Sequence, residues 1–162
     1  MKKVILGATG SIGSSLAKKL VESGEQVHLV GRDEASLSEL ANELNSTFTT
    51  CDVLEENFSE KIINDLKDEQ VNGLAYCVGS IDLKPLKLTK KSDFMQSFNL
   101  NLVSATEIIK SLADNLKASK GSIVLFSTVA GQQGFPNHAI VSSAKGAVEG
   151  LTLALAAEYA PN

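Results

Sequence analysis

The sequence predicts an α/β protein with a doubly wound parallel sheet and helices on both of its faces. Short runs rich in β-branched residues alternate with longer segments whose apolar residues have helical spacing. A glycine-rich turn follows the first run and opens the first helical segment. With right-handed crossovers, this alternation predicts five parallel strands in the order 3-2-1-4-5.

The first half of the chain alternates three times between a strand-like run and a helical segment. Each run is short and β-branched, and each helical segment spaces its apolar residues as Ile12, Leu16 and Leu20 do. Gly24 ends the first helix, and Asp33 is placed to cap the second. In order, the expected elements are KVILG (3–7), a helix over 11–24, QVHLVG (26–31), EASLSELANEL (34–44), TFTTCDV (47–53) and FSEKIINDLKDE (58–69).

The second half continues the alternation with two strands and two longer helices. Residues 80–91, which include Pro85, and the Gly/Pro segment 129–138 are expected to be loops. No linker, repeat or low-complexity segment interrupts the series, so residues 1–162 are expected to form a single domain. The expected elements are VNGLAYCVG (71–79), a helix from Ser92 to Ala118, GSIVLFST (121–128) and a last helix that runs to Tyr159.

The composition argues against several classes of partner. The net charge is −4 and no basic patch gathers, so nucleic acid is not expected as a partner. No apolar run is expected to span a bilayer, and MKKVILGATG indicates a first strand rather than a leader, so no membrane partner is expected. Cys51 and Cys77 lie far apart without a CxxC motif, which indicates two buried, reduced thiols in a cytoplasmic protein.

The segment GATGSIG, residues 7–13, predicts a nucleotide site of the Rossmann type. Glycines allow a tight turn and a close approach of the backbone to a pyrophosphate, and the helix N-terminus supplies free N–H groups. A plain glycine turn is the alternative, but a strand before the motif and a helix after it favour nucleotide binding. The predicted contacts are Gly7, Thr9, Gly10, Ser11, Ile12 and Gly13.

The end of the second strand favours NADP over NAD. An acidic side chain at this point binds the adenosine ribose hydroxyls of NAD, but Gly31 occupies the position and Arg32 follows it. A guanidinium can bind a 2′-phosphate through two hydrogen bonds. The alternative is a solvated Arg32, with Asp33 acting only as a helix cap. The remaining cofactor contacts are expected at Asp52, Val53 and Gly79.

Six stretches in matching order resemble the short-chain dehydrogenase/reductase family over the whole chain: GATGSIG, CDV, AYCVGS, FNLNLVSA, GSIVLFSTVAG and AKGAVEGLTLALAAEYAP. The resemblance implies a three-layer Rossmann-type fold, a nicotinamide cofactor and a small carbonyl or alcohol substrate. It also implies a homo-oligomer formed through the last helix. Family members continue into further strands and a substrate lid, so these residues are expected to be an N-terminal fragment that lacks the C-terminal strands.

Two motifs depart from the family pattern. The usual Gly-x-x-x-Gly-x-Gly falls on Gly7, Ser11 and Gly13, with an additional Gly10. The usual Asn-Asn-Ala-Gly reads YCVG, so Tyr76 and a cysteine replace both asparagines. The resemblance therefore implies that polar contacts between the fourth strand and its neighbours are lost.

The family's catalytic group of Asn, Ser, Tyr and Lys is only partly matched. Asn101 matches the asparagine, with Asn99 a less favoured register. Thr128 falls on the serine, and Lys145 matches the lysine that binds the nicotinamide ribose. The tyrosine position, four residues before that lysine, holds Val141.

Valine offers no proton, so the chemistry has been lost, moved or replaced. A general acid contributes typically ~10²–10⁴ in rate. His138 is the best chemical substitute, although capping the last helix or bonding the backbone is its favoured role. The leading hypothesis is an NADP-dependent oxidoreductase of this family with a displaced or weakened proton donor. The alternatives are a catalytically inactive NADP-binding sensor or scaffold, and a structural subunit that binds no nucleotide.

Overall fold

Five parallel strands form one sheet in the computed structural model, which describes residues 1–161. The strands are β1 (Lys2–Leu6), β2 (Gln26–Gly31), β3 (Thr47–Thr50), β4 (Val71–Tyr76) and β5 (Ser122–Leu125). Their order is β3-β2-β1-β4-β5, and Leu6 of the central strand lies opposite both Val30 and Tyr76. The predicted strand order and direction are confirmed.

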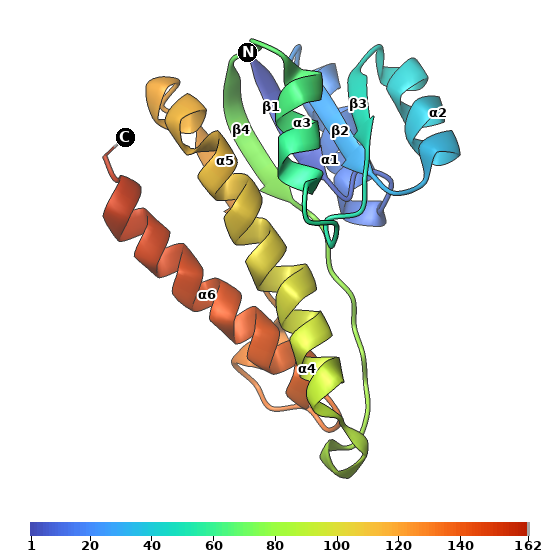
Figure 1. The fold of residues 1–162 in the computed structure, drawn as a ribbon, viewed down its shortest axis with the longest axis vertical. Coiled ribbons are helices and arrows are strands. Elements are labelled where there is room, and N and C mark those ends of the chain that lie inside the picture. Colours follow the sequence, from blue (N-terminus) through green and yellow to red (C-terminus); the bar gives the residue numbers. More distant parts are fainter. Residues whose placement is uncertain (162) are drawn as a thin grey trace.

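Helices cover both faces of this sheet, as Figure 1 shows. Because side chains alternate along a strand, Ile5 of β1 packs under α1 and α2, whereas Val4 and Leu6 pack under α3 and α5. Helices α4 and α6 lie on the same side of the sheet as α3 and α5. Helix α4 continues into α5, and α6 runs beside both of them. The helices are α1 (Ser11–Glu22), α2 (Glu34–Leu44), α3 (Phe58–Leu66), α4 (Lys91–Phe98), α5 (Ser104–Ala118) and α6 (Ala139–Tyr159).

The second strand has the predicted bounds, but the other four end earlier than the sequence pattern predicts. The first was expected to include Gly7, but this residue has φ +74°, a left-handed conformation that turns the chain out of the sheet. The third, fourth and fifth strands were expected to reach residues 53, 79 and 128. The apolar residues that follow their true ends belong to turns at the carboxyl edge of the sheet, so apolar composition alone overestimated the strands.

The helix predicted from Ser92 to Ala118 is interrupted by a π-helical turn over Asn99–Val103. The hydroxyl of Ser104 lies 2.9 Å from the Asn99 carbonyl oxygen and 2.8 Å from that of Val53. This side chain therefore links the turn to the segment that follows β3. Single π-helical turns are often found at functional sites.

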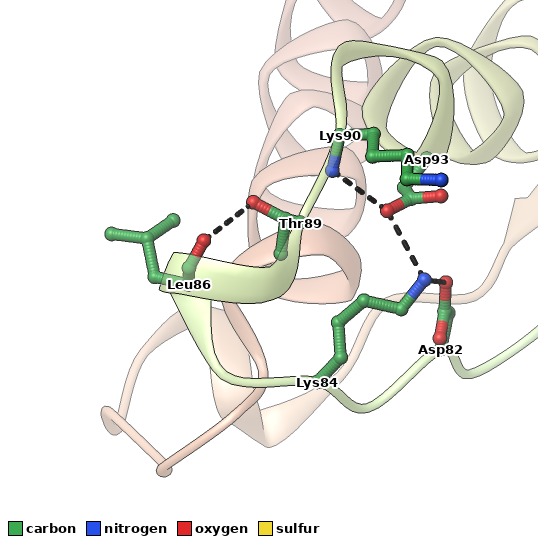
Figure 2. A network of polar contacts seen from close by, with 6 residues as sticks. All are labelled: Asp82, Lys84, Leu86, Thr89, Lys90 and Asp93. Atoms are coloured by element: carbon green, nitrogen blue, oxygen red, sulfur yellow. Dashed lines mark hydrogen bonds and ion pairs between the residues drawn. The ribbon is translucent and has the colours of Figure 1, made fainter.

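The loop before α4 is held by a compact polar network, drawn in Figure 2. The Lys84 ammonium lies 3.2 Å from Asp82 and 3.1 Å from Asp93. Asp93 also accepts a hydrogen bond from the Lys90 backbone N–H at 2.8 Å, which caps α4. A short 3-10 turn, Leu86–Leu88, forms within the segment expected to be a plain loop.

A chain of hydrogen bonds crosses the outer strands and ends at α3. The buried His28 ring lies between the hydroxyls of Thr47 (2.8 Å) and Thr49 (2.9 Å). Thr47 accepts from the Lys2 ammonium, and Thr49 donates to the Asp65 carboxylate at 2.7 Å. Because Thr49 has only one proton, His28 Nε2 must donate to it and Nδ1 must accept from Thr47. Burial is the main reason that the pKa of His28 falls from 6.5 to about 4.

Helix α6 is the one helix of residues 1–161 with the length and composition to cross a membrane. It has 21 residues and an 18-residue window of mean hydropathy 1.3. This corrects the expectation that no run in the sequence was long enough. A single helix of this kind is weak evidence for a membrane span, because core helices of soluble proteins pass the same test. In α6, 22% of this window is buried, and the buried residues of the helix are Ile140, Val141, Ala144 and Val148.

Candidate functional site

A cleft of about 700 Å³ lies at the carboxyl ends of the central strands. The strand order reverses between β1 and β4, which is where open α/β sheets bind ligands. Ser11, Ile12 and Gly13 begin α1 beside this cleft. The predicted cofactor residues that line it are Gly7, Thr9, Gly10, Arg32, Asp52, Val53 and Gly79.

The glycine loop is packed so tightly that side chains cannot enter it. A β-carbon on Gly7 would lie 2.9 Å from the carbonyl group of Cys77, and one on Gly13 would lie 2.9 Å from the Ala8 Cα. Within residues 1–161, the backbone N–H groups of Ser11 and Ile12 have no acceptor, and no side chain caps α1. The loop therefore leaves the positive end of a helix free for an anion.

Arg32 and Asp52 meet at the rim of the cleft. The Arg32 side chain is 75% exposed, and its NH1 lies 3.5 Å from Asp52 Oδ2. Asp52 Oδ1 accepts from the Leu54 N–H at 3.0 Å, which also gives this residue a role in the turn. Asp33 instead caps α2 by accepting from Ser36 N at 2.8 Å, as predicted. Hydrogen bonding by Ser36, through its hydroxyl first and its N–H second, lowers the pKa of the Asp33 carboxyl. The Arg32 guanidinium is thus a largely exposed cation whose contact with Asp52 is long.

The end of the cleft brings Asn101, Gly79 and Lys145 together. Asn101 Oδ1 and Lys145 Nζ lie 3.0 and 3.4 Å from the point where a β-carbon on Gly79 would stand. The Asn101 side chain is buried and donates to the Ser97 carbonyl at 2.9 Å, but its Oδ1 has no partner among residues 1–161. Burial lowers the pKa of Lys145. An unsatisfied buried oxygen beside an ammonium fits a ligand hydroxyl.

The two hydroxyls at the end of β5 have separate partners. Thr128 Oγ1 accepts from the Ala130 N–H at 3.3 Å and so caps the short turn Val129–Gly131. Ser127 Oγ donates to Glu149 of α6 at 2.5 Å. Within residues 1–161, no hydrogen bond joins Thr128 to Asn101 or Lys145. Asn101 and Lys145 therefore lie together near Gly79, and the Thr128 hydroxyl is not linked to them.

The first turn of α6 carries the remaining candidates. The Val141 side chain is 3% exposed and packs into the domain. His138 stands at the N-cap position, with Nδ1 2.7 Å from the Pro136 carbonyl oxygen and its ring 5.5 Å from that of Phe135. Since a carbonyl oxygen only accepts, Nδ1 carries a proton and is occupied with the loop backbone.

The fourth strand retains a polar link that the resemblance did not imply. The buried Tyr76 hydroxyl donates to the Leu100 carbonyl at 2.7 Å, which ties β4 to the π-helical turn. Burial raises the pKa of Tyr76 well above its usual value. Cys51 is buried as expected, but Cys77 is only half-buried, and burial raises the pKa of each thiol to about 11.

Sequence reasoning missed several residues that line the cleft, among them Ser80, Gln96 and Leu100. Gln96 and Leu100 are four residues apart, which places them on one helical side, but a helix pattern does not reveal what that side faces. It also missed Glu149, whose contact with Ser127 joins residues that are distant in the sequence. No group of three or more His, Cys, Asp or Glu side chains suited to a metal occurs in residues 1–161.

A second cavity, of about 360 Å³, lies between α5, β5 and α6. Its lining is mostly apolar and includes Leu116, Ile123 and Leu155. Its one ammonium, from Lys117, stands 4.4 Å from the centre of the Tyr159 ring. We place the functional site in the larger cleft, because only that cleft combines a glycine cradle, a helix N-terminus and a guanidinium.

The family profile and the relatives that match this chain all describe dehydrogenases or reductases. The sequence profile of the family described as "short chain dehydrogenase" matches residues 2–162. L-fucose dehydrogenase of Oryctolagus cuniculus is 32% identical over 157 residues, which cover 94% of this chain and 55% of that protein. L-xylulose reductase of Bos taurus is 30% identical over 166 residues, which cover 99% of this chain and 66% of that protein.

A solved structure described as a short chain dehydrogenase/reductase family protein superposes with a TM-score of 0.93 at 24% identity, covering 100% of this chain and 69% of its own. This similarity shows the fold. The chain therefore spans somewhat more than half the length of the curated relatives named above. Since the family profile covers nearly every residue, the chain belongs to the short chain dehydrogenase family.

Proposed function

We propose that this chain provides the cofactor-binding part of an NADP-dependent oxidoreductase that acts on a small carbonyl or alcohol substrate. The observation that carries the proposal is the cleft in which the glycine loop, the free N-terminus of α1 and Arg32 converge. Relatives named as a sugar dehydrogenase and a sugar reductase support the class of reaction. They also favour an enzyme over a nucleotide-binding scaffold.

Each part of the cleft has a task in this proposal. The N–H groups at the start of α1 bind the pyrophosphate, and Arg32 binds the 2′-phosphate that distinguishes NADP from NAD. Asp52 and Val53 lie where the adenine is expected. Lys145 and the unpartnered Asn101 Oδ1 bind the nicotinamide ribose hydroxyls. The bound nicotinamide supplies or accepts the hydride, and the chain orients it.

Proton transfer is the weak step of the proposed reaction. Val141 cannot donate, and the His138 Nδ1 proton is directed at the Pro136 carbonyl. Thr128 retains a hydroxyl that can polarise a carbonyl group, but a hydroxyl is a poor acid without an activating base. We therefore propose a turnover reduced by a factor of about 10²–10⁴, the usual contribution of general acid catalysis.

The surroundings of the site extend the proposal to assembly and location. Along α6, Gly146, Gly150, Ala154 and Leu153 are exposed, which suits close packing against a helix of a second copy. We propose a homo-oligomer formed through this face. The two free thiols suit a reducing compartment, so we propose a cytoplasmic location.

The test has two steps that separate binding from catalysis. NADPH fluorescence is titrated with the chain, and saturable binding is expected. A panel of sugar and ketone substrates is then screened by NADPH absorbance with the full-length polypeptide, where slow but measurable oxidation is expected. Absence of NADPH binding would refute the cofactor site. Binding without any turnover across the panel would favour the scaffold function.

A further inference from the structure

Lys145 and Glu149 have the spacing of an intrahelical ion pair but do not form one. Residues four apart on a helix face each other, and Lys–Glu pairs at this spacing usually attract. In residues 1–161, however, no ion pair includes Lys145. Its ammonium instead lies near Gly79 at the end of the cleft. Another contact therefore holds the Glu149 carboxylate away from the Lys145 ammonium.

Ser127 holds this carboxylate on the β5 side of the helix. Its hydroxyl donates to Glu149 Oε1 at 2.5 Å, a short hydrogen bond to a charged acceptor. The same Oγ lies 3.3 Å from the Lys145 carbonyl oxygen, so it contacts the backbone of the helix turn between the two charges. Glu149 Oε1 also lies 3.6 Å from the point where a β-carbon on Gly131 would stand. The carboxylate therefore lies close to the short turn Val129–Gly131.

We propose that Ser127 is a positioning residue that withholds Glu149 from Lys145 and thereby keeps the Lys145 ammonium free for a ligand. Naming this ligand as the nicotinamide ribose rests on the function proposed above. An ammonium already paired with a carboxylate would have to break that pair before it could bind hydroxyls. The Ser127–Glu149 hydrogen bond removes this competition before the cofactor arrives.

The size of the effect follows from ordinary ion-pair energies. Exposed pairs contribute up to about 1 kcal/mol, so competition from Glu149 should weaken cofactor binding by up to about fivefold. The two substitutions should change cofactor affinity in opposite directions. Removal of the Ser127 hydroxyl should weaken binding, whereas additional removal of the Glu149 charge should restore it. A purely structural role for Ser127 predicts no such restoration.

The experiment compares the wild-type chain with Ser127→Ala, Glu149→Gln and the double variant. Lysines are reductively methylated with ¹³C, and the Lys145 signal, assigned by its loss in Lys145→Arg, is titrated by NMR to obtain its pKa. Ser127→Ala should raise the pKa of Lys145 towards its ordinary value, because a carboxylate then stabilises the charged form. Glu149→Gln and the double variant should keep it low, since an amide carries no charge.

NADP titrations of the same four chains give the second readout. The Ser127→Ala chain should bind up to about fivefold more weakly, and the double variant should bind like the wild type. An unchanged Lys145 pKa in Ser127→Ala, or failure of Glu149→Gln to rescue it in a chain with an unchanged unfolding midpoint, would overturn the inference. If the wild type binds no NADP, the ribose assignment and the proposed function fall, and the pKa comparison alone decides whether Ser127 withholds Glu149.

Discussion

The weak proton transfer that we propose depends on the side chain at position 141. Val141 is buried, so it fills a packed site as well as lacking a titratable group. The other candidates have partners of their own, since His138 bonds the loop and Thr128 accepts from the Ala130 N–H. Within residues 1–161, Lys145 forms no ion pair and Asn101 Oδ1 has no hydrogen-bond partner. In the proposed function, these two residues bind the ligand and Val141 leaves the proton donor missing.

Val141→Tyr should restore a donor at a cost in stability. The larger ring must enter a packed site, so the free energy of unfolding should fall by about 1–3 kcal/mol. NADPH-dependent carbonyl reduction by the full-length polypeptide should rise, because a phenol beside Lys145 can donate a proton. Urea unfolding and NADPH absorbance measure the two effects. Val141→Phe is the matched control, with the same bulk and no hydroxyl; equal activity in both variants would contradict the account.

His138→Ala tests whether the proton donor has moved. Because His138 Nδ1 donates to the Pro136 carbonyl, we expect the substitution to loosen the loop and leave native turnover within about threefold. The readout is the pH profile of NADPH oxidation in the full-length polypeptide. Strong native turnover that follows an imidazole-like profile and disappears in this variant would show that the donor is His138.

At the element scale, the long helix before β5 shows what a periodic pattern cannot reveal. Apolar spacing predicts a helix across residues 92–118, and the chain is helical throughout this region. The π-helical turn over Asn99–Val103 was not predicted, and it coincides with the placement of Asn101 beside Gly79. The Ser104 hydroxyl that bonds Asn99 and Val53 could be identified only from three-dimensional contacts.

The hydrogen-bond chain through β2 and β3 should make the free energy of unfolding depend on pH. The folded pKa of His28 is about 4 and the unfolded value is near 6.5, so the unfolded chain binds the proton more readily. The contribution of His28 to the free energy of unfolding should therefore be fully present above pH 6.5 and should fall as the pH decreases towards 4. The loss between pH 7.5 and 4.5 should be about 2–3 kcal/mol.

Urea unfolding of the wild type and His28→Gln at both pH values measures this contribution. The glutamine does not titrate, so the variant should lose about 2–3 kcal/mol less than the wild type over the same interval. Other groups titrate in both chains and cancel in the difference. Equal losses in the two chains would show that the His28 pKa is not depressed in the folded state.

At the scale of the whole molecule, the sequence pattern predicted the architecture better than the site. The alternation of elements fixed the strand order, because parallel strands joined by right-handed crossovers allow few arrangements. The glycine loop and Arg32 could be recognised because their chemistry is local in the sequence. The pairing of Ser127 with Glu149 and of Tyr76 with Leu100 could not, because each joins separate elements through contacts that no spacing rule describes.

The proposed oligomer should depend on the exposed face of α6. Leu153 is 75% exposed there, and a charge at this position would have to be desolvated in a helix–helix contact. Leu153→Glu should therefore lower the molar mass measured by sedimentation at micromolar concentration. Leu86→Glu, which alters a similarly exposed leucine in the loop before α4, should leave the mass unchanged. A wild-type chain that is already monomeric would refute the assembly.

The account rests most directly on the choice of cofactor by Arg32, and titration with NADP and NAD measures that choice. Charge-assisted hydrogen bonds to a phosphate contribute about 1.5–3 kcal/mol, so Arg32→Ala should weaken NADP binding by about 10- to 100-fold. NAD lacks the 2′-phosphate, and its affinity should change by less than about threefold. Lys87→Ala, which removes the same charge from an exposed position in the loop before α4, should alter neither affinity. Equal weakening of both cofactors by Arg32→Ala would contradict the account.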